Sequence, residues 1–254
     1  MSDFDRNYAA ARRGVGADRA VAIDQGLRAY MIRVYNYMAM GVALTGVVSW
    51  FTFQAAVETN ANGAIVGLTS FGQALYSGPA VLVLFLGTLG LVFLISWRID
   101  RLQPSTAFAL FMLYAGLLGL MLSSIFLTYT GTSITRVFFI SAASFGALSL
   151  YGYTTQRDLS PIGSFLMMGV IGLIIAMVVN IFLKSTGLDF VISAAGVLIF
   201  AGLTAWDTQK IKEMFDPMED GTIVGRKAVM GALTLYLDFI NLFLFMLRLF
   251  GDRR

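Results

Sequence analysis

The sequence predicts an all-α polytopic membrane protein with seven transmembrane helices, the last of which lies at the centre. The chain of 254 residues is 57% hydrophobic and only 13% charged, whereas a soluble domain is about 25% charged. Apolar runs of about 20 residues, the length that crosses a bilayer, recur along nearly the whole chain. The last run also carries polar residues at helical spacing, and such a face must be shielded from lipid.

The chain divides into a polar N-terminal segment and a membrane domain. Residues 1–28 have mixed charge and few apolar residues, which predicts a flexible cytoplasmic tail. Residues 29–254 hold the apolar runs and form the predicted seven-helix transmembrane domain. The expected spans are 30–53, 79–97, 106–128, 134–153, 162–183, 190–208 and 228–250.

Local residues justify these spans in turn. The first begins where charge disappears near Ala29, and the second, third and fifth each begin at or soon after a proline, which is favoured at a helix start. The fourth and sixth are rich in Ser, Ala and Gly, small residues that let helices approach closely in lipid. The connection 54–78 is polar and is expected outside, whereas the charged connection 209–227 is expected inside.

Positive charge sets the orientation. With seven spans, thirteen Lys and Arg residues fall on the side of the N-terminus and five on the other side, so the N-terminus is predicted to be cytoplasmic. Three of the five lie at the basic C-terminus. If the last segment were re-entrant, the C-terminus would lie inside and the division would be sixteen against two. Seven spans are the preferred interpretation.

The chain contains no cysteine and no histidine. Disulfides, thiol chemistry and the usual zinc, haem and copper ligands are therefore excluded, and no cofactor is expected. No nucleophile–base set predicts an enzyme. The net charge of +3 fits the positive-inside rule and indicates no nucleic-acid partner. The expected partners are the lipid bilayer and small cations, and the absence of cysteine fits a bacterial inner (plasma) membrane.

Two aspartates are the main candidate site. Asp207 closes the sixth apolar run and Asp238 lies within the seventh, on a stripe that includes Thr234 and Asn241 as a supporting polar face. A carboxylate inside the membrane is costly unless it is paired, protonated or hydrated. If the two meet, they would share one proton and act as a pH sensor without histidine. Doubly ionised, they could attract calcium, which prefers oxygen ligands.

Simpler interpretations stay open at this point. Asp207 could be solvated at the interface or paired with Lys210 or Arg98. Arg98, at the end of the second span, could be an interfacial anchor whose charge reaches the headgroups. Its functional interpretation is a latch that holds Asp207.

Three segments give the sequence a family resemblance: TAWDTQKIKEMF, GALTLYLDFINLFLFMLRLFG and QRDLSPIGSFL. They resemble the bacterial branch of the Bax inhibitor-1 family, and the resemblance extends over all seven spans. It implies a fold in which six helices wrap the last one, and a pH-sensitive calcium leak. It also implies that the paired aspartates of the family are Asp207 and Asp238, and that its latch arginine is Arg98.

One departure leaves two functions open. Some members carry an acidic residue eleven positions before the latch arginine, where this chain has Gly87, so calcium conduction is in question. The alternative is a non-conducting modulator of a membrane-anchored AAA protease or a stress response, with the N-terminal tail as a contact. A third possibility is a proton-coupled transporter that uses the same aspartates.

Overall fold

The computed structural model describes residues 3–61 and 64–254, with side chains from residue 23 onward, and in this part of the chain almost all regular structure is helical. The elements are α1 (Asp3–Ala56), β1 (Val57–Thr59), β2 (Ile65–Leu68), α2 (Ser70–Leu75), α3 (Gly78–Arg98), the 3-10 turn η1 (Ile99–Arg101), α4 (Pro104–Leu122), α5 (Ile125–Thr128), α6 (Gly131–Thr154), α7 (Ser160–Leu183), α8 (Thr186–Glu213) and α9 (Gly221–Phe250). Seven of these helices are long and apolar enough to span a membrane, which confirms the predicted fold class.

Capping residues fix the helix ends. Ser77, Thr130 and Ser185 each accept a hydrogen bond from a backbone N–H in the first turn of α3, α6 and α8. Such caps satisfy donors that have no partner within the helix. The connection expected as an external loop contains an antiparallel hairpin of β1 and β2 followed by α2. The sequence did not predict these short strands.

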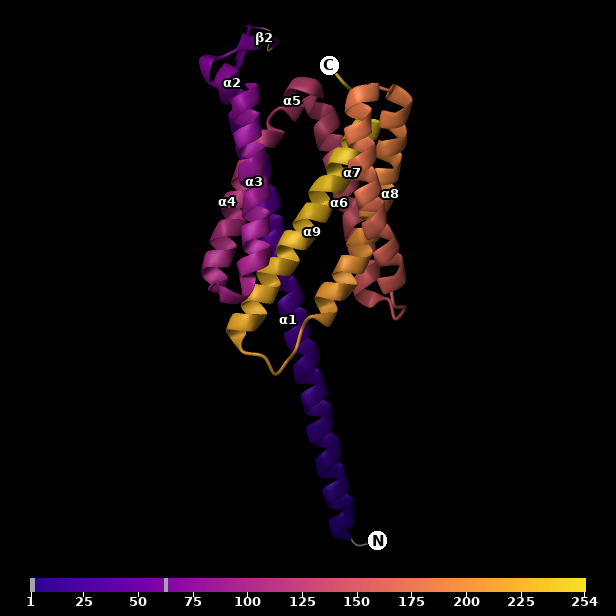
Figure 1. The fold of residues 1–254 in the computed structure, drawn as a ribbon. Coiled ribbons are helices and arrows are strands. Elements are labelled where there is room, and N and C mark those ends of the chain that lie inside the picture. Colours follow the sequence, from indigo (N-terminus) through magenta and orange to yellow (C-terminus); the bar gives the residue numbers. More distant parts are fainter. Residues whose placement is uncertain (1–2, 62–63) are drawn as a thin grey trace.

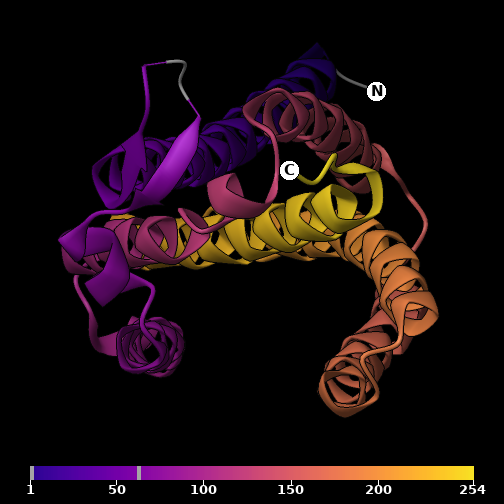
Figure 2. The same ribbon diagram turned by 90° about the horizontal axis from the view of Figure 1, so that it is seen from above.

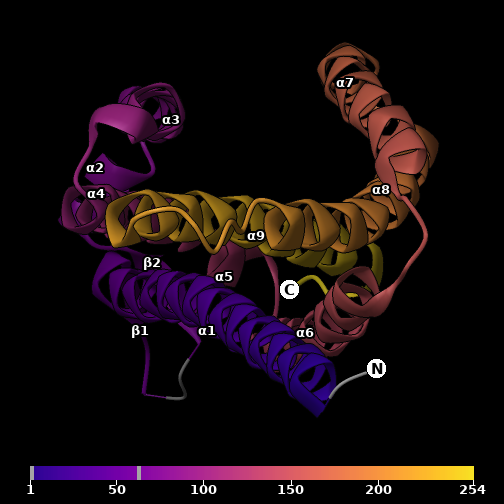
Figure 3. The same cartoon turned by 90° about the horizontal axis from the view of Figure 1, so that it is seen from below.

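Helix α9 lies at the centre of the bundle (Figures 2 and 3). Within the most apolar stretch of α9, 72% of the residues are buried. The same measure is 11% for α3 and 6% for α7. Helices α1, α4, α6 and α8 pack directly on α9, whereas α3 packs mainly on α4 and α7 on α8. The expectation that all six helices wrap the last one is therefore only partly met. Helices α3 and α7 have the highest mean hydropathy, 2.5 and 2.7, so lipid can surround most of their circumference.

The N-terminal segment, predicted as a flexible tail, is helical from Asp3 onward. From Asp3 the chain is continuous with α1, which projects beyond the bundle (Figure 1). Residues 1–2 and the side chains up to residue 22 lie outside the described part of the chain. The stretch is rich in Ala and Arg, which have high helix propensity. The predicted flexibility of this segment stays a prediction.

The two ends of the chain lie at opposite ends of the bundle (Figure 1). Helix α9 runs unbroken through 30 residues, so the last segment is a full crossing and not re-entrant. The C-terminal residues dock on the α5–α6 connection: Asp252 O accepts from Thr130 N at 3.1 Å, and Arg254 N donates to Thr128 O at 2.9 Å. Ion pairs of Asp252 with Arg136 and of Arg253 with Asp189 offset part of the basic charge at this end.

Candidate functional site

Close packing of α8 against α9 positions the candidate aspartates. The two helices are antiparallel, and a Cβ on Gly196 of α8 would meet the Phe245 ring of α9 at 2.5 Å. Nearer the other end, a Cβ on Gly231 of α9 would meet Ile211 of α8 at 2.9 Å. This register brings Asp238 within about one helical turn of Asp207 along the helix axes. Glycine at position 196 is required because a larger residue would separate the helices.

The carboxyl groups of Asp207 and Asp238 are close enough to share a side-chain hydrogen bond. Asp207 is 8% exposed and Asp238 is 5% exposed. Because an ionised carboxylate only accepts hydrogen bonds, such a bond requires a proton on one of the two. The second oxygen of Asp238, Oδ2, is buried and has no hydrogen-bond partner among the described residues. The arrangement can therefore hold one proton between the two carboxyl groups, with Asp238 Oδ2 outside any other hydrogen bond of the described residues.

Lys210 is the positively charged residue whose electrostatic field acts on Asp207. Its Nζ lies 5.1 Å from the centroid of the Trp206 ring. The alternative was that Asp207 pairs with Lys210, but no ion pair within 4.0 Å joins these two described residues. Lys210 stays exposed, so solvent screens its influence.

A chain of hydroxyl groups beside Asp207 was not predicted from the sequence. Tyr35 Oη of α1 lies 2.6 Å from Ser149 Oγ of α6, which lies 2.9 Å from Thr208 Oγ1 of α8. Thr208 donates to Thr204 O at 2.7 Å. The chain ties three helices together next to the aspartate pair. Its members come from three distant segments, so no periodicity in the sequence could reveal them.

A second polar contact anchors the other side of α9. Tyr236 Oη lies 2.6 Å from Thr45 Oγ1 of α1, and Thr45 Oγ1 is also within hydrogen-bond range of Ala115 O of α4, at 2.9 Å. The Tyr236 ring packs edge-on against Phe111 and Tyr114 of α4. These contacts fix the rotation of α9, which bears Asp238 two residues further on.

The supporting polar face, Thr234 and Asn241, makes its hydrogen bonds within α9 and not to the aspartate pair. Thr234 donates to Met230 O at 3.1 Å and Asn241 donates to Leu237 O at 2.9 Å, both within α9. Both side chains are half-buried. Neither of these hydrogen bonds reaches Asp207 or Asp238.

Arg98 is not brought to the pair. It is exposed at the C-terminal end of α3 and lines a small cavity of about 170 Å³ with Trp97 and Arg101. The structure describes both Arg98 and Asp207, and no ion pair joins them. The reason is architectural: α3 packs on α4, whereas Asp207 lies on α8 at the other side of α9 (Figure 3).

The aspartate pair offers few ligands for a metal ion. Among the described residues no group of three or more Asp, Glu, His or Cys side chains could hold one. Calcium takes about six to eight oxygen ligands, and two carboxylates supply at most four. The two carboxylates alone therefore do not complete the coordination shell of a calcium ion.

Comparison with known proteins identifies the family. Residues 27–254 match the family model described as inhibitor of apoptosis-promoting Bax1. The chain is 48% identical to the uncharacterized protein RP147 of Rickettsia prowazekii, over 91% of this chain and 92% of the relative. It is 44% identical to the inner membrane protein YbhL of Escherichia coli, over 94% of this chain and 97% of the relative. An uncharacterized Caulobacter vibrioides protein is 42% identical over the full length of both chains. The chain therefore belongs to the Bax inhibitor-1 family of polytopic membrane proteins.

Proposed function

We propose that this protein is a pH-sensitive calcium leak whose sensor is the Asp207–Asp238 pair. The observation that carries the proposal is the close approach of two carboxyl groups buried among transmembrane helices, beside an Asp238 oxygen with no hydrogen-bond partner among the described residues. A bond that needs a shared proton depends on proton activity. A role in proton sensing would also account for two costly groups that lie together.

The proposed mechanism couples protonation to helix packing. With one proton the carboxyls hold α8 against α9. When that proton is lost, two adjacent negative charges repel each other, and the pair either separates or binds a divalent cation. Separation would loosen the interface between α8 and α9 and open a path for calcium. Arg98 could serve as a latch for Asp207 only if α3 moved toward α8, so this role belongs to a second arrangement of the helices.

The test is calcium flux into liposomes that hold the purified protein, measured at about pH 6 and about pH 8, on either side of neutrality. We expect flux in the parent to change with pH, and to lose this dependence in Asp207→Asn and in Asp238→Asn. Asp189→Asn is the matched control, because Asp189 lies at the other end of α8 and is partly exposed. It should keep the pH dependence of the parent.

Two results would overturn the proposal. One is flux no greater than that of empty liposomes at both pH values. The other is unchanged pH dependence in both pair variants. A pH dependence lost equally in Asp189→Asn would assign the effect to general destabilisation of α8 and would also remove support for the sensor.

A second candidate is a non-conducting modulator of a membrane-anchored AAA protease or of a stress response. It is favoured by the extension of α1 beyond the bundle (Figure 1) and by Gly87, which supplies no acidic group to an ion path. Deletion of residues 1–22 should then abolish co-purification of the partner, whereas Asp207→Asn should retain it. Retained binding after the deletion would exclude the extension as the contact.

For either function we propose the bacterial inner membrane as the location, with the N-terminus cytoplasmic, because the relative YbhL is an inner membrane protein.

A further inference from the structure

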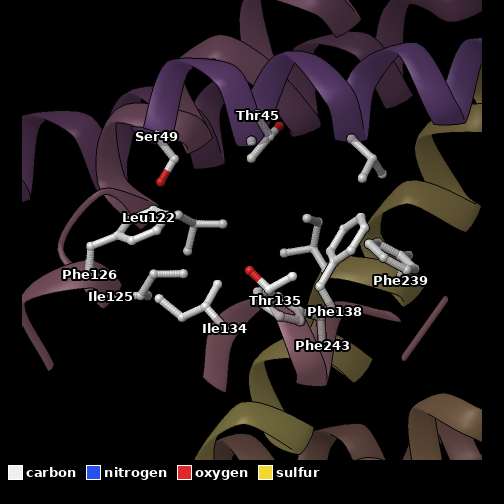
Figure 4. A pocket seen from close by; sticks show the side chains of 13 residues that line it. Thr45, Ser49, Leu122, Ile125, Phe126, Ile134, Thr135, Phe138, Phe239 and Phe243 are labelled. Atoms are coloured by element: carbon white, nitrogen blue, oxygen red, sulfur yellow. The ribbon is translucent and has the colours of Figure 1, made fainter. Parts of the chain in front are cut away.

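A pocket separate from the aspartate pair lies between α1, α5, α6 and α9 (Figure 4). Its volume is about 250 Å³. The walls are mostly apolar and aromatic, and they include Phe126, Phe138, Phe239 and Phe243. The pocket is large enough to admit several water molecules. Water in such a space would find too few polar partners, and an apolar occupant fits the walls better.

One polar group in this pocket has no partner. Ser49 of α1 is 4% exposed, and its Oγ makes no hydrogen bond to any described residue. A helical serine usually bonds to the carbonyl four residues earlier, as Thr45 does one turn away with Gly41 O at 3.0 Å. The Ser49 hydroxyl points instead toward the pocket (Figure 4). A buried donor without a partner is costly, so the pocket offers a hydrogen bond to an acceptor on its occupant.

The α6 wall across the pocket from Ser49 does not provide a hydrogen-bond acceptor for the Ser49 hydroxyl. Thr135 of α6 also points its hydroxyl toward the pocket (Figure 4), and it donates to Gly131 O at 3.0 Å. No hydrogen bond joins Thr135 to Ser49, although the structure describes both. The occupant must therefore bring a carbonyl or similar oxygen to the Ser49 side.

The depth of Ser49 indicates which carbonyl this is. Ser49 lies seven residues before Ala56, where α1 ends, which is about 10 Å along the helix. Thr135 lies four residues after the start of α6 at Gly131, or about 6 Å along it. The polar layer of a bilayer is about 5–8 Å thick on each side of the hydrocarbon core. The pocket therefore opens near the boundary where lipid ester groups lie, at the bundle end opposite the N-terminus.

We propose that this pocket binds an ester-linked membrane lipid, with one acyl chain between the phenylalanine side chains and its ester carbonyl accepting a hydrogen bond from Ser49. The site goes beyond the proposed calcium leak and does not depend on it, because its test measures lipid and not ion flux. The protein would hold this lipid as a structural partner between α1 and α6, which both pack on α9.

Trp50 reports lipid at the pocket through the difference between two lipids, because its ring is also 44% exposed to the surrounding bilayer. Its ring lies 5.5 Å from that of Phe126, a pocket wall. With Trp97→Phe and Trp206→Phe, Trp50 is the sole tryptophan of the chain. The protein is reconstituted in vesicles that contain increasing fractions of a phosphatidylcholine brominated on its acyl chains, either the diester or the diether form. We expect the diester to quench Trp50 at a lower fraction than the diether, which keeps the chain but lacks the carbonyl.

Two variants assign the difference to the pocket. Ser49→Ala should raise the diester fraction needed for half-maximal quenching roughly three- to tenfold, as expected for one hydrogen bond, and leave the diether unchanged. Gly46→Leu should block both lipids, because Gly46 lines the pocket and a Cβ there meets nothing within 4 Å. Gly146→Leu on α6 also has open space but lines a different pocket, so it is the matched control and should behave as the parent.

A second measurement guards against effects of removing Trp206. Native mass spectrometry of the otherwise unaltered chain should show retained diester lipid that Ser49→Ala and Gly46→Leu lose and Gly146→Leu keeps, with similar thermal unfolding in all four proteins. Equal quenching by diester and diether, together with no change in Ser49→Ala, would overturn the proposal and leave the pocket to water or to unspecific lipid contact.

Discussion

At the scale of single residues, Asp238 stands out because it is buried among apolar helices and one of its oxygens has no partner. A buried carboxylate loses hydration that a single neighbouring carboxyl cannot replace. Such an arrangement lowers stability and is retained at sites where the charge or its proton has a use. We therefore expect position 238 to show a measurable trade between stability and pH response.

The first prediction is that Asp238→Asn stabilises the protein. An amide keeps the shape of the side chain, can donate to the Asp207 carboxylate and never carries a negative charge. We expect the unfolding midpoint in detergent at about pH 8 to rise by a few degrees, since about 1 kcal/mol shifts it by about 2–4 °C in a chain of this size. Asp189→Asn should not raise it. A lower midpoint for Asp238→Asn would show that the ionised pair contributes to stability.

A second residue-scale prediction concerns Asp220, which caps α9 outside the membrane. Its carboxylate accepts hydrogen bonds from the N–H groups of Ile223 at 2.9 Å and Thr222 at 2.7 Å. These bonds hold the pKa of Asp220 below its usual value. Because the folded pKa lies below the unfolded value of about 3.9, the stabilisation is fully present above that value and is lost as pH falls through the folded pKa.

Thermal unfolding between about pH 3 and about pH 7 checks the effect at Asp220. We expect Asp220→Ala to lower the midpoint above about pH 4 and to differ less from the parent below it. Asp220→Asn keeps the cap without the charge, so it should stay closer to the parent and show a smaller change with pH. A constant difference between Asp220→Ala and the parent at all pH values would contradict the role of the ionised carboxylate.

At the scale of elements, the α8–α9 interface depends on a close approach at Gly196. A methyl group there would lie 2.5 Å from two atoms of the Phe245 ring, which is too close for non-bonded carbons. We expect Gly196→Ala to destabilise the protein by about 1–3 kcal/mol, the usual cost of overpacking, despite the higher helix propensity of alanine. Thermal unfolding measures this.

Two further variants make the Gly196 prediction specific. Gly172→Ala on α7 meets nothing within 4 Å and should be neutral or slightly stabilising. Phe245→Leu has a smaller side chain, so Gly196→Ala should cost less in that background, and the difference is the coupling between the two positions. If the two substitutions change stability additively, the strain caused by Gly196→Ala does not arise from contact with Phe245.

Helix α3 allows a test of the missing acidic residue. Gly87 and Gly90 are both exposed on α3, and a Cβ at either position meets nothing within 4 Å. If an acidic group at position 87 belongs to the ion path, Gly87→Glu should increase calcium flux in proteoliposomes, whereas Gly90→Glu should not. An equal increase in both would indicate a general effect of negative charge on α3.

The elements also show how far the sequence could be interpreted. All seven spans were predictable, because each apolar run is long enough to cross a bilayer and its ends are set by prolines, caps and charges. The partners of Asp207 were less accessible. Counting residues to the nearest lysines places Asp238 much deeper than Asp207, and only the tilt and register of α8 and α9 bring them together. The contacts of Tyr35, Ser149 and Thr208 depend on three-dimensional packing alone.

At the scale of the whole molecule, the distribution of charge and the position of the termini agree on one topology. Seven crossings place the basic C-terminus at the end opposite the N-terminus (Figure 1). By the count of Lys and Arg alone, a basic C-terminus on the outer side is unfavourable. In the structure, Arg253 is near Asp189 at 3.8 Å and Asp252 pairs with Arg136 at 2.8 Å. Exposed pairs stabilise little, but they lower the net positive charge at this end.

The last prediction tests this topology in cells. Because the chain has no cysteine, a single introduced thiol is the only one present. Val66 of β2 is 64% exposed at one end of the bundle, and Met218 in the α8–α9 connection is 78% exposed at the other (Figure 1). With the N-terminus cytoplasmic, a membrane-impermeant maleimide should label Val66→Cys in intact bacterial cells whose outer membrane is permeable to it. Met218→Cys should be labelled only after the inner membrane is opened. The reverse pattern would invert the orientation. Labelling of both in intact cells would mean that the two sites share one side, which an odd number of crossings between hairpin and connection cannot produce.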